Sequence, residues 1–295
     1  MGKWLNRISG KELKLFSIFS VVLFLAAAVI VAFAAGDWKG LAEGVWLIVV
    51  SRDALITDYF ELVGYGAAFL NAAFVLGISI ALVVSQKIPF TGPTMAALFI
   101  NAGYALWGKN PVNIIPVILG TALYAKTHKS KLSRYIYTAL FGTCLAPLLT
   151  ELVYLFPFGQ PVNFLLAVAV GIFIGFVMPP LSMHTASMHL GYNLFNVGFS
   201  GGILAFAIVC ILRAFGMESD SVLIWKEGQN IYIGTGLFLY FLIAIVFGFL
   251  ISGRKIGGLK KIMGRPGRAV ADFVLMDGAG ATLMNMGLVG IVCEL

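Results

Sequence analysis

Two asparagines end matching stretches of apolar sequence and are the first candidates for chemistry. DYFELVGYGAAFLN ends at Asn71 and DFVLMDGAGATLMN ends at Asn285, and the two stretches share Asp, Gly, Gly and Asn at a constant offset of 214 residues. These matches indicate an internal repeat. Amide side chains inside apolar helices face the protein interior and form hydrogen bonds. We therefore predict that the two amides either contact a polar solute or join two helices.

Each matching stretch begins with an aspartate, Asp58 in the first and Asp272 in the second. A carboxylate at the start of a helix accepts hydrogen bonds from free N–H groups and interacts favourably with the helix dipole. We expect both aspartates to cap the helices that follow them.

The segment TGPTMAALFINAGYALWGKNPVNIIPVILGTALYA, residues 91–125, contains Gly and Pro that interrupt two apolar pieces. Thr91 is expected to cap a half-helix with Pro93 in its first turn, and the free N–H groups of such a helix favour an anion or a carbonyl oxygen. Broken helices occur at membrane depth only where they are buried in protein or line a cavity. Five candidate residues of the segment either line a pathway or satisfy loop backbone: Thr91, Thr94, Asn101, Asn110 and Asn113.

The stretch PPLSMHTASMHLGYNLFN contains two histidines and two further candidate amides. His184 and His189 are five residues apart, about 140° around a helix, which differs from the i, i+4 pair of a zinc-binding H-E-x-x-H helix. We predict no metal here. Histidine titrates near neutral pH, so the stretch could transfer a proton or bind a solute through His184, His189, Asn193 and Asn196. The alternative is a polar turn at the inner side of a membrane.

Glu151 is the one acidic residue well inside an apolar span, LFGTCLAPLLTELVYLF. A carboxylate at membrane depth is costly and is a functional hypothesis by default, here a coupling site for a proton or a cation. The alternative is that Glu151 lies near the outer interface and reaches water.

Sequence motifs of enzymes are missing. The chain contains no G-x-S-x-G, no G-x-x-x-x-G-K-[ST] and no H-E-x-x-H, and its three cysteines all lie in apolar runs. We therefore predict no catalytic residues, no cofactor and no metal.

The composition decides the class of protein. Hydrophobic residues make up 60% of the chain and charged residues 11%, against about 25% charged residues in soluble proteins. Apolar runs of roughly 17 to 25 residues, the length of a membrane span, recur along the chain. We predict an all-α fold, a polytopic transmembrane helical bundle with inverted-topology repeats and Gly/Pro-broken helices, which form either two short spans or a re-entrant pair in residues 91–125.

The basic residues set the predicted topology. Most of them lie in blocks 3–14, 126–134 and 254–268, which the positive-inside rule places in the cytoplasm together with the N-terminus. This grouping argues against a nucleic-acid partner. The predicted spans alternate outward and inward, while residues 91–125 begin and end inside; the spans are Leu15–Ala35, Leu62–Ser85, Tyr135–Phe156, Asn163–Met178, Gly198–Phe215 and Ile231–Ser252.

In this topology the repeat copy at Asp58 enters the membrane from outside and the copy at Asp272 enters from inside. Inverted repeats with Gly/Pro-broken helices are typical of transporters and channels. We assign residues 1–268 to a first repeat with its connecting helices and 269–295 to the start of a second. Because that second repeat has no room before residue 295, we expect a longer protein or a gene model cut short.

Three stretches resemble a known family: FTGPTMAALFINAGYALWGKNPVNIIPVILG, HTASMHLGYNLFNVGFSGG and the paired repeat sequences. They are similar to an uncharacterised bacterial multi-pass membrane family, domain-of-unknown-function family 1576. The resemblance covers the whole chain and implies that the C-terminal part of the family is missing. It implies no activity.

The sequence favours a membrane channel or transporter for a small polar solute, located in the bacterial cytoplasmic (inner) membrane. Its pathway would be lined by Asn71, residues 91–113 and the stretch from His184 to Asn196. One alternative is a proton- or ion-coupled carrier. Another is a membrane-embedded enzyme that acts on a lipid or isoprenoid through His184 and Asp58 or Asp272. The partners expected are the lipid bilayer and the solute, and a homo-oligomer is left open.

Overall fold

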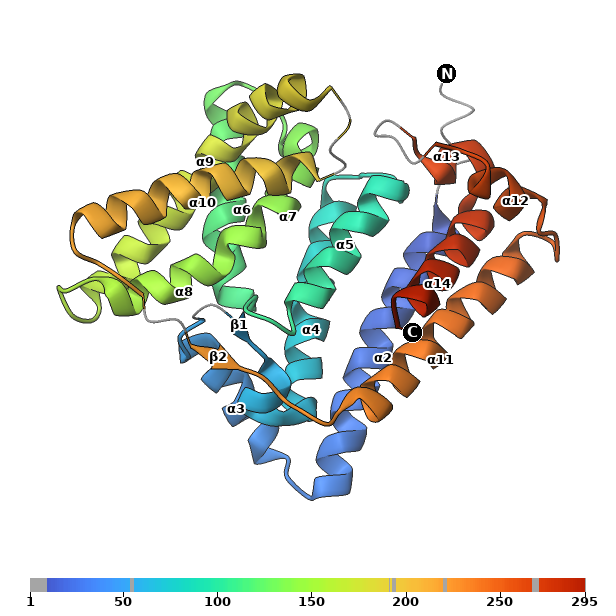
Figure 1. Ribbon diagram of the computed structural model, residues 1–295, viewed down its shortest axis with the longest axis horizontal. Coiled ribbons are helices and arrows are strands. Elements are labelled where there is room, and N and C mark those ends of the chain that lie inside the picture. Colours follow the sequence, from blue (N-terminus) through green and yellow to red (C-terminus); the bar gives the residue numbers. More distant parts are fainter. Residues whose placement is uncertain are drawn as a thin grey trace. The chain divides into compact units, whose positions relative to one another are not determined.

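Helices make up almost all of the regular structure in the computed structural model, which describes residues 10–53, 56–190, 192, 195–219, 222–266 and 271–294 (Figure 1). The elements are α2 (Lys11–Ala35), α3 (Lys39–Val50), β1 (Ile56–Thr57), α4 (Tyr59–Ser85), α5 (Gly92–Tyr104), α6 (Pro111–Thr127), η1 (Leu132–Tyr135), α7 (Ile136–Gly142), η2 (Thr143–Leu145), α8 (Ala146–Leu155), α9 (Val162–His189), α10 (Asn196–Ala214), β2 (Leu223–Ile224), α11 (Asn230–Ile251), α12 (Gly257–Met263), α13 (Phe273–Asp277) and α14 (Ala279–Glu294).

Six helical segments in the described part of the chain are long and apolar enough to cross a membrane, which confirms the predicted class of an all-α multi-pass membrane protein. They agree with the six predicted spans to within a few residues, except at one end described below. The segments are Lys11–Ala35, Tyr59–Ser85, Leu132–Leu155, Val162–His189, Asn196–Ala214 and Ile231–Ile251.

The chain divides into two compact units. The first contains the chain up to Ser17, Pro89–Ala96 and the chain from Lys226 on, while the second contains Ile18–Ile88 and Ala97–Trp225. Helices α2 and α5 each contribute residues to both units. The assignment of residues 1–268 and 269–295 to two repeats stays a prediction.

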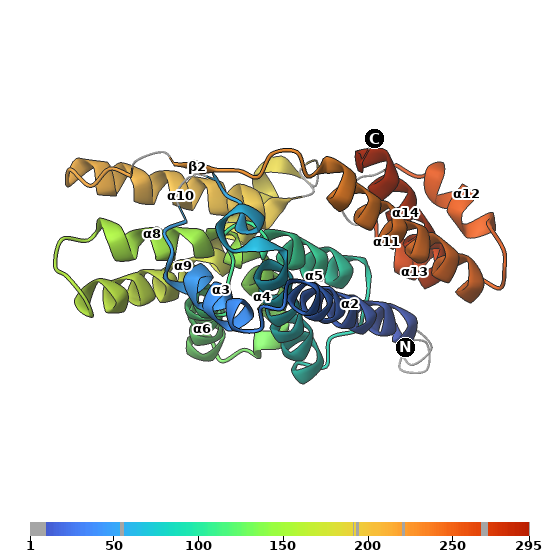
Figure 2. The ribbon, with the colours of Figure 1, turned by 90° about the horizontal axis from the view of Figure 1, so that it is seen from below.

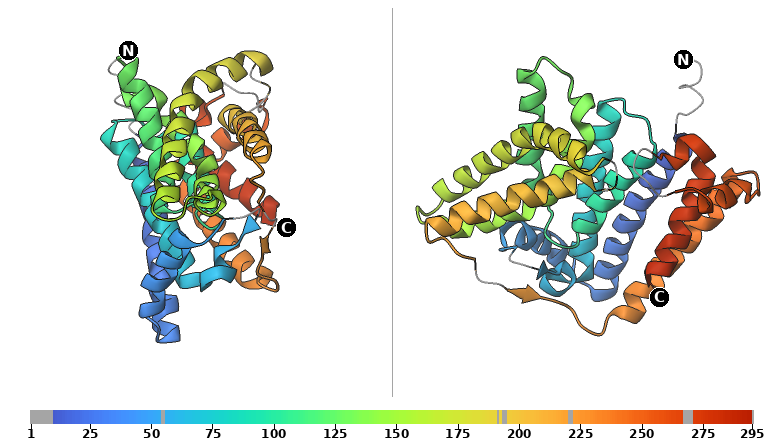
Figure 3. Two further views of the ribbon diagram at one scale, coloured as in Figure 1. Left: turned by 90° about the vertical axis from the view of Figure 1, so that its left-hand side faces the viewer. Right: turned by 45° about the horizontal axis from the view of Figure 1, so that its top comes forward.

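In the second unit, α6 and α9 approach each other closely through two glycines. A Cβ atom on Gly120 would lie 2.0 Å from the carbonyl oxygen of Ile172, and one on Gly175 would lie 2.0 Å from that of Val117. Small residues let membrane helices pack backbone to backbone. Around this crossing α9 packs against α8 and α10 as well, as the right-hand view of Figure 3 shows for α10.

The helix α9 corrects one prediction. The span was expected to end at Met178, before Pro179 and Pro180, but the helix continues to His189. Pro179 lacks the N–H group that would bind the carbonyl of Gly175, and the hydroxyl of Thr121 on α6 donates to that carbonyl instead at 2.9 Å. A neighbouring helix thus satisfies the backbone that proline leaves open, as membrane helices with internal proline require.

In the first unit, α11 and α14 lie side by side (Figure 2). A Cβ atom on Gly248 of α11 would lie 2.6 Å from the carbonyl oxygen of Gly280, and one on Gly287 of α14 would lie 2.6 Å from that of Phe241. Glycines again set the contact between two membrane helices.

The two repeat stretches have the same local structure. The carboxylate of Asp58 accepts from the N–H of Phe60 at 2.8 Å, and that of Asp272 accepts from the N–H of Val274 at 3.0 Å, which confirms both predicted caps. One turn later the helix breaks at Gly64, with φ 77°, and at the equivalent Gly278, with φ 93°. Glycine is the residue that adopts this region without strain, which explains its presence at both positions.

The similarity extends upstream of the predicted repeat. A Cβ atom on Gly44 of α3 would lie 2.5 Å from Ala67, and one on Gly258 of α12 would lie 2.8 Å from Ala281. Both residues of the second pair follow those of the first by the same 214 positions. The repeated structure therefore includes the short helix before each aspartate, a relation that the sequence comparison of residues 58–71 and 272–285 did not include.

Two loops that the charge pattern places outside the membrane contact each other. Ile56 pairs with Leu223 and Thr57 with Ile224 in a short parallel ladder of β1 and β2, and the N–H of Asp58 donates to the carbonyl of Ile224 at 3.0 Å. Loops on one side of a membrane can pair in this way, so the contact agrees with the predicted topology.

The close crossing of α6 and α9 predicts a difference between two glycine substitutions. Gly120→Ala should destabilise the protein by about 1 to 3 kcal/mol, since the new methyl group has no room. Gly77→Ala, on an open part of α4 with no atom within 4 Å of the new Cβ, should be neutral or stabilising by up to about 1 kcal/mol. Unfolding of the purified variants in detergent, followed by circular dichroism, measures both. Equal stability of the two variants would contradict the packing described.

Candidate functional site

The interruption between α5 and α6, residues 105–110, is the centre of a buried polar cluster. Asn110 caps α6 because its side chain accepts from the N–H groups of Val112 and Asn113, both at 2.9 Å, and Pro111 suits the first turn. The N–H of Tyr59, at the start of α4, donates to the carbonyl of Leu106 at 3.1 Å. The break therefore lies toward the end of the second unit where α4 begins.

Lys109 is the charged residue of this break and is fully buried, with 0% exposed. Its Nζ donates to Asn101 Oδ1 at 2.6 Å and to Thr143 Oγ1 at 3.0 Å, and it lies 5.1 Å from the centre of the Tyr104 ring. Within the described part of the chain no carboxylate lies within ion-pair distance of this ammonium. A buried cation with only neutral partners is costly.

Asn71 fastens the middle of α4 to both sides of the break. Its Nδ2 donates to the carbonyl of Ala105 at 2.6 Å and to that of Lys109 at 2.8 Å. The Oδ1 atom is buried and has no hydrogen-bond partner among the described residues. The predicted candidates Asn71 and Asn101 are thus brought together around Lys109, whereas Asn285 lies half-buried in the other unit.

A second group of polar side chains surrounds Gly108 in the break. Asn113 Nδ2 donates to the carbonyl of Gly108 at 2.8 Å and to Thr150 Oγ1 at 3.1 Å. The hydroxyl of Tyr59 donates to Asp53 Oδ1 at 3.0 Å. Two buried atoms of this group have no hydrogen-bond partner in the part of the chain that the structure describes, Asp53 Oδ2 and Asn110 Nδ2.

Gly108 allows the group to form. It has φ +117°, and a Cβ atom there would lie 3.0 Å from Pro147 and 3.8 Å from the carboxyl carbon of Asp53. The Asp53 side chain is 8% exposed, and burial raises the pKa of its carboxyl to about 7, although the hydroxyls of Tyr59 and Thr150 lower it. This carboxyl therefore titrates close to neutral pH.

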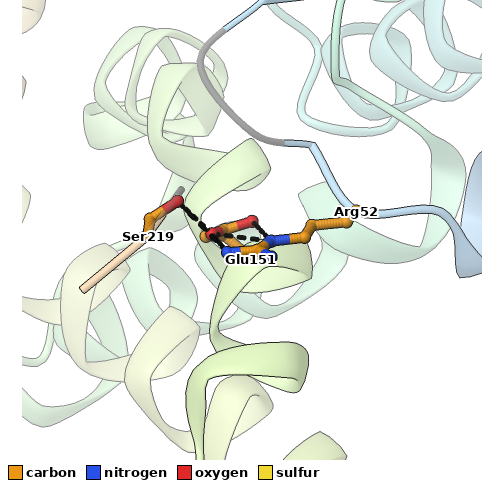
Figure 4. Close-up of polar contacts among 3 residues, drawn as sticks. All are labelled: Arg52, Glu151 and Ser219. Atoms are coloured by element: carbon orange, nitrogen blue, oxygen red, sulfur yellow. Dashed lines mark hydrogen bonds and ion pairs between the residues drawn. The ribbon is translucent and has the colours of Figure 1, made fainter. Parts of the chain in front are cut away.

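Glu151, the predicted coupling residue, belongs to an ion pair. Arg52 donates from Nη2 to Glu151 Oε1 at 2.7 Å and from Nε to Oε2 at 2.8 Å, and the hydroxyl of Ser219 also donates to Oε1 (Figure 4). The Glu151 side chain is 7% exposed and that of Arg52 31%. Two loops therefore supply the partners of this carboxylate, and its charge is compensated.

The histidine stretch forms a separate cluster between α9 and α10. Asn196 Oδ1 lies 2.8 Å from His189 Nε2 and accepts from Thr185 Oγ1 at 2.8 Å, while Asn196 Nδ2 donates to the carbonyl of Ser182 at 2.9 Å. These bonds join the end of α9 to the start of α10. His184 is exposed and does not take part, and Asn193 lies outside the described residues.

The start of α5 differs from the prediction. The N–H of Gly92 donates to the carboxylate of Asp272 at 3.1 Å, and the Thr94 hydroxyl donates to the carbonyl of Pro89 at 2.8 Å. Thr91 is buried there, but its hydroxyl makes no hydrogen bond within the described part of the chain. An acidic side chain of the protein thus occupies the helix end that was expected to attract an anion.

Sequence reasoning missed Lys109, Asp53, Tyr59, Arg52 and Thr143. A signal for Lys109 existed, because it is the only charged residue between Lys87 and Lys126 and stands in a segment broken by Gly and Pro. Asp53 carried no such signal, since it follows Arg52 in a loop of mixed charge. Among the described residues no three His, Cys, Asp or Glu side chains gather into a metal site.

Comparison with known families identifies the chain. The family model described as a protein of unknown function, DUF1576, matches residues 38–214 and 251–295. The chain belongs to the DUF1576 family. The matched residues include Asp53, Asn71, Lys109, Glu151 and both repeat stretches, so the site lies within the family's own sequence. No curated protein and no solved structure matches the chain.

The contacts of Asn71 predict a difference between the two repeat asparagines. Asn71→Leu leaves the buried carbonyls of Ala105 and Lys109 without a donor and should destabilise the protein by about 1 to 3 kcal/mol. Asn285→Leu is the matched control, with an expected change within about 0.5 kcal/mol. Unfolding in detergent compares the two. A larger loss of stability for Asn285→Leu than for Asn71→Leu would contradict this prediction.

Proposed function

We propose that this membrane protein conducts or transports a small polar solute, and that the break between α5 and α6 forms part of the pathway. The single observation that supports the proposal is the buried ammonium of Lys109, held by neutral oxygens inside a bundle of apolar helices. Ionisable side chains in such bundles are costly and mark substrate or ion pathways by default.

The chemistry of the break suits a solute with oxygen acceptors. Lys109 offers N–H donors, the unpaired amide of Asn110 offers another, and the unpaired Oδ1 of Asn71 accepts. A small molecule that carries both carbonyl or carboxylate oxygens and a donor would satisfy these groups. Opening the contact between Lys109 and Asn101 would place the ammonium on the solute.

The repeat supports the same proposal. The α3–α4 and α12–α14 regions share their caps, glycine breaks and close contacts, and four crossings lie between α4 and α14 if each candidate span crosses once and α5 with α6 returns to its starting side. Equivalent helices would then have opposite directions, as inverted repeats of transporters do. We place the protein in a bacterial inner membrane with a cytoplasmic N-terminus.

The membrane-embedded enzyme has less support than transport. It needed His184 and an aspartate to converge in one cavity, yet His184 is exposed. Asp58 and Asp272 are each used as helix caps.

Flux into proteoliposomes tests the proposal. The purified protein should move at least one member of a panel of small polar solutes and ions, and Lys109→Met should reduce this flux about tenfold or more, because a hydrogen bond to a charged group contributes about 1.5 to 3 kcal/mol. Lys126→Met, at an exposed position, is the control and should leave flux unchanged.

Stability separates this role of Lys109 from a structural one. Replacing a buried charge by an apolar side chain of similar length is often neutral or stabilising. We therefore expect Lys109→Met to unfold no more easily than the wild type. Absence of flux for every solute would argue against transport, and marked destabilisation would assign Lys109 to the fold.

A coupled carrier is the second candidate, because Glu151 stands buried beside Arg52 at the predicted outer end. If the pair opens during transport, Glu151→Gln should abolish uptake driven by a pH or sodium gradient while exchange of solute continues. Uptake that never responds to a gradient, in the wild type or in the variant, would favour a passive channel.

Labelling of single cysteines tests the opposite orientation of the repeats. In a background without Cys144, Cys210 and Cys293, Ile56→Cys should react with a membrane-impermeant maleimide on intact cells, whereas Ala271→Cys should react only after permeabilisation. Both positions are exposed and precede the capping aspartates. Labelling of both from the same side would remove the inverted arrangement and its support for transport.

A further inference from the structure

Asp53 is a buried carboxyl that the proposed pathway does not use. It lies in the loop between α3 and α4 and is held against Gly108 in the break. One oxygen accepts from the Tyr59 hydroxyl, and the other is buried without a hydrogen-bond partner. An ionised carboxylate so placed would leave one oxygen without a donor, whereas a neutral carboxylic acid fits better.

No cation among the described residues is paired with the carboxyl of Asp53. Tyr59 faces it from α4, and Thr150 and Glu151 face it from α8. Burial raises the pKa of Asp53, the hydroxyls of Tyr59 and Thr150 lower it, and the negative charge of Glu151 raises it. The adjacent Arg52 is bound to Glu151. Lys109 follows Gly108, but its ammonium is bonded to Asn101 and Thr143.

We propose that Asp53 is a proton-binding site at the predicted outer end of the protein and that its protonation state sets the position of the α5–α6 break. The use of this proton in solute transport rests on the proposed function. The proton site itself stands on the buried, half-paired carboxyl and the break that it contacts.

The geometry suggests how the proton acts. When the carboxyl releases its proton to water at the outer end, the resulting carboxylate has two accepting oxygens and needs a second donor. Asn110 Nδ2 is an unpaired donor in the same polar group. Movement of Asn110 toward Asp53 would loosen the cap of α6, since Asn110 Oδ1 holds the N–H groups of Val112 and Asn113. Proton release would thereby shift the break.

Tryptophan fluorescence tests the site without any solute. Trp107 lies in the break, with its ring centre 5.1 Å from that of Trp225. In detergent the emission of the purified full chain should change with pH around a midpoint near 7. Asp53→Asn should remove this transition, Asp37→Asn at an exposed position should keep it, and Trp107→Phe should remove the signal.

Stability gives a second measure in case a variant alters emission directly. Because the pKa of Asp53 is raised from 3.8 to about 7 on folding, the folded state holds the proton more tightly than the unfolded state. The resulting stabilisation is full below the lower value and is lost as the pH rises through the higher one. The Tm of the wild type should therefore fall across this window, and that of Asp53→Asn should fall less.

The outcomes of these measurements distinguish a proton site at Asp53 from a metal-cation site and from the absence of a site. A transition that persists in Asp53→Asn, with an unchanged pH dependence of Tm, would overturn the proposal. A midpoint that shifts with sodium concentration would assign the site to a metal cation instead of a proton.

Transport is judged separately: solute flux in Asp53→Asn proteoliposomes should continue but lose its response to a pH gradient. If no solute moves but the Asp53-dependent transition remains, the transport proposal fails and the proton site stands.

Discussion

The burial of the Lys109 ammonium without a carboxylate partner is the constraint on which the candidate site depends. Its partners come from two different elements, Asn101 on α5 and Thr143 in η2, so the charge can be accommodated only when these elements meet. The single O–H group of Thr143 can donate either to Asn101 Oδ1, at 2.8 Å, or to the carbonyl of Leu140, at 2.6 Å. A cation held by neutral oxygens still attracts a further acceptor, which is why the break is the candidate site of the proposed function.

Three other places in the described part of the chain show side chains of one element that bind backbone groups left open in another. Asn71 of α4 binds two carbonyls of the break, Thr121 of α6 binds the carbonyl freed by Pro179, and Asp272 binds the first N–H of α5. Within a membrane water cannot take these roles. Some polar side chains of the described residues therefore bind backbone groups of another element. Others have buried atoms without a hydrogen-bond partner, and these atoms belong to Asp53, Asn71 and Asn110, around residues 105–110.

The sequence predicted the spans well because hydropathy and charge are local properties, and it predicted the repeat because its Asp and Gly positions are fixed by backbone geometry. It also selected Asn71, Asn101 and Asn113. It could not place Asp53 or show that Glu151 is paired, since these depend on contacts across many residues, such as that between Arg52 and Glu151. The end of α9 was missed for the same reason: only the distant Thr121 makes the helix possible through Pro179.

The two repeat copies share residues that shape the backbone, whereas several residues of the candidate site have no equivalent in the second copy. The positions that shape the backbone are shared between the copies, Asp58 with Asp272 and Gly64 with Gly278. Asn71 and Asn285 are shared too, but other polar positions are not: at the same offset Arg52, Asp53 and Tyr59 correspond to a proline, a glycine and a phenylalanine at positions 266, 267 and 273. The second copy therefore lacks the carboxyl and the phenol of the candidate site. The proposed proton binding at Asp53 does not follow from the local structure that both copies share.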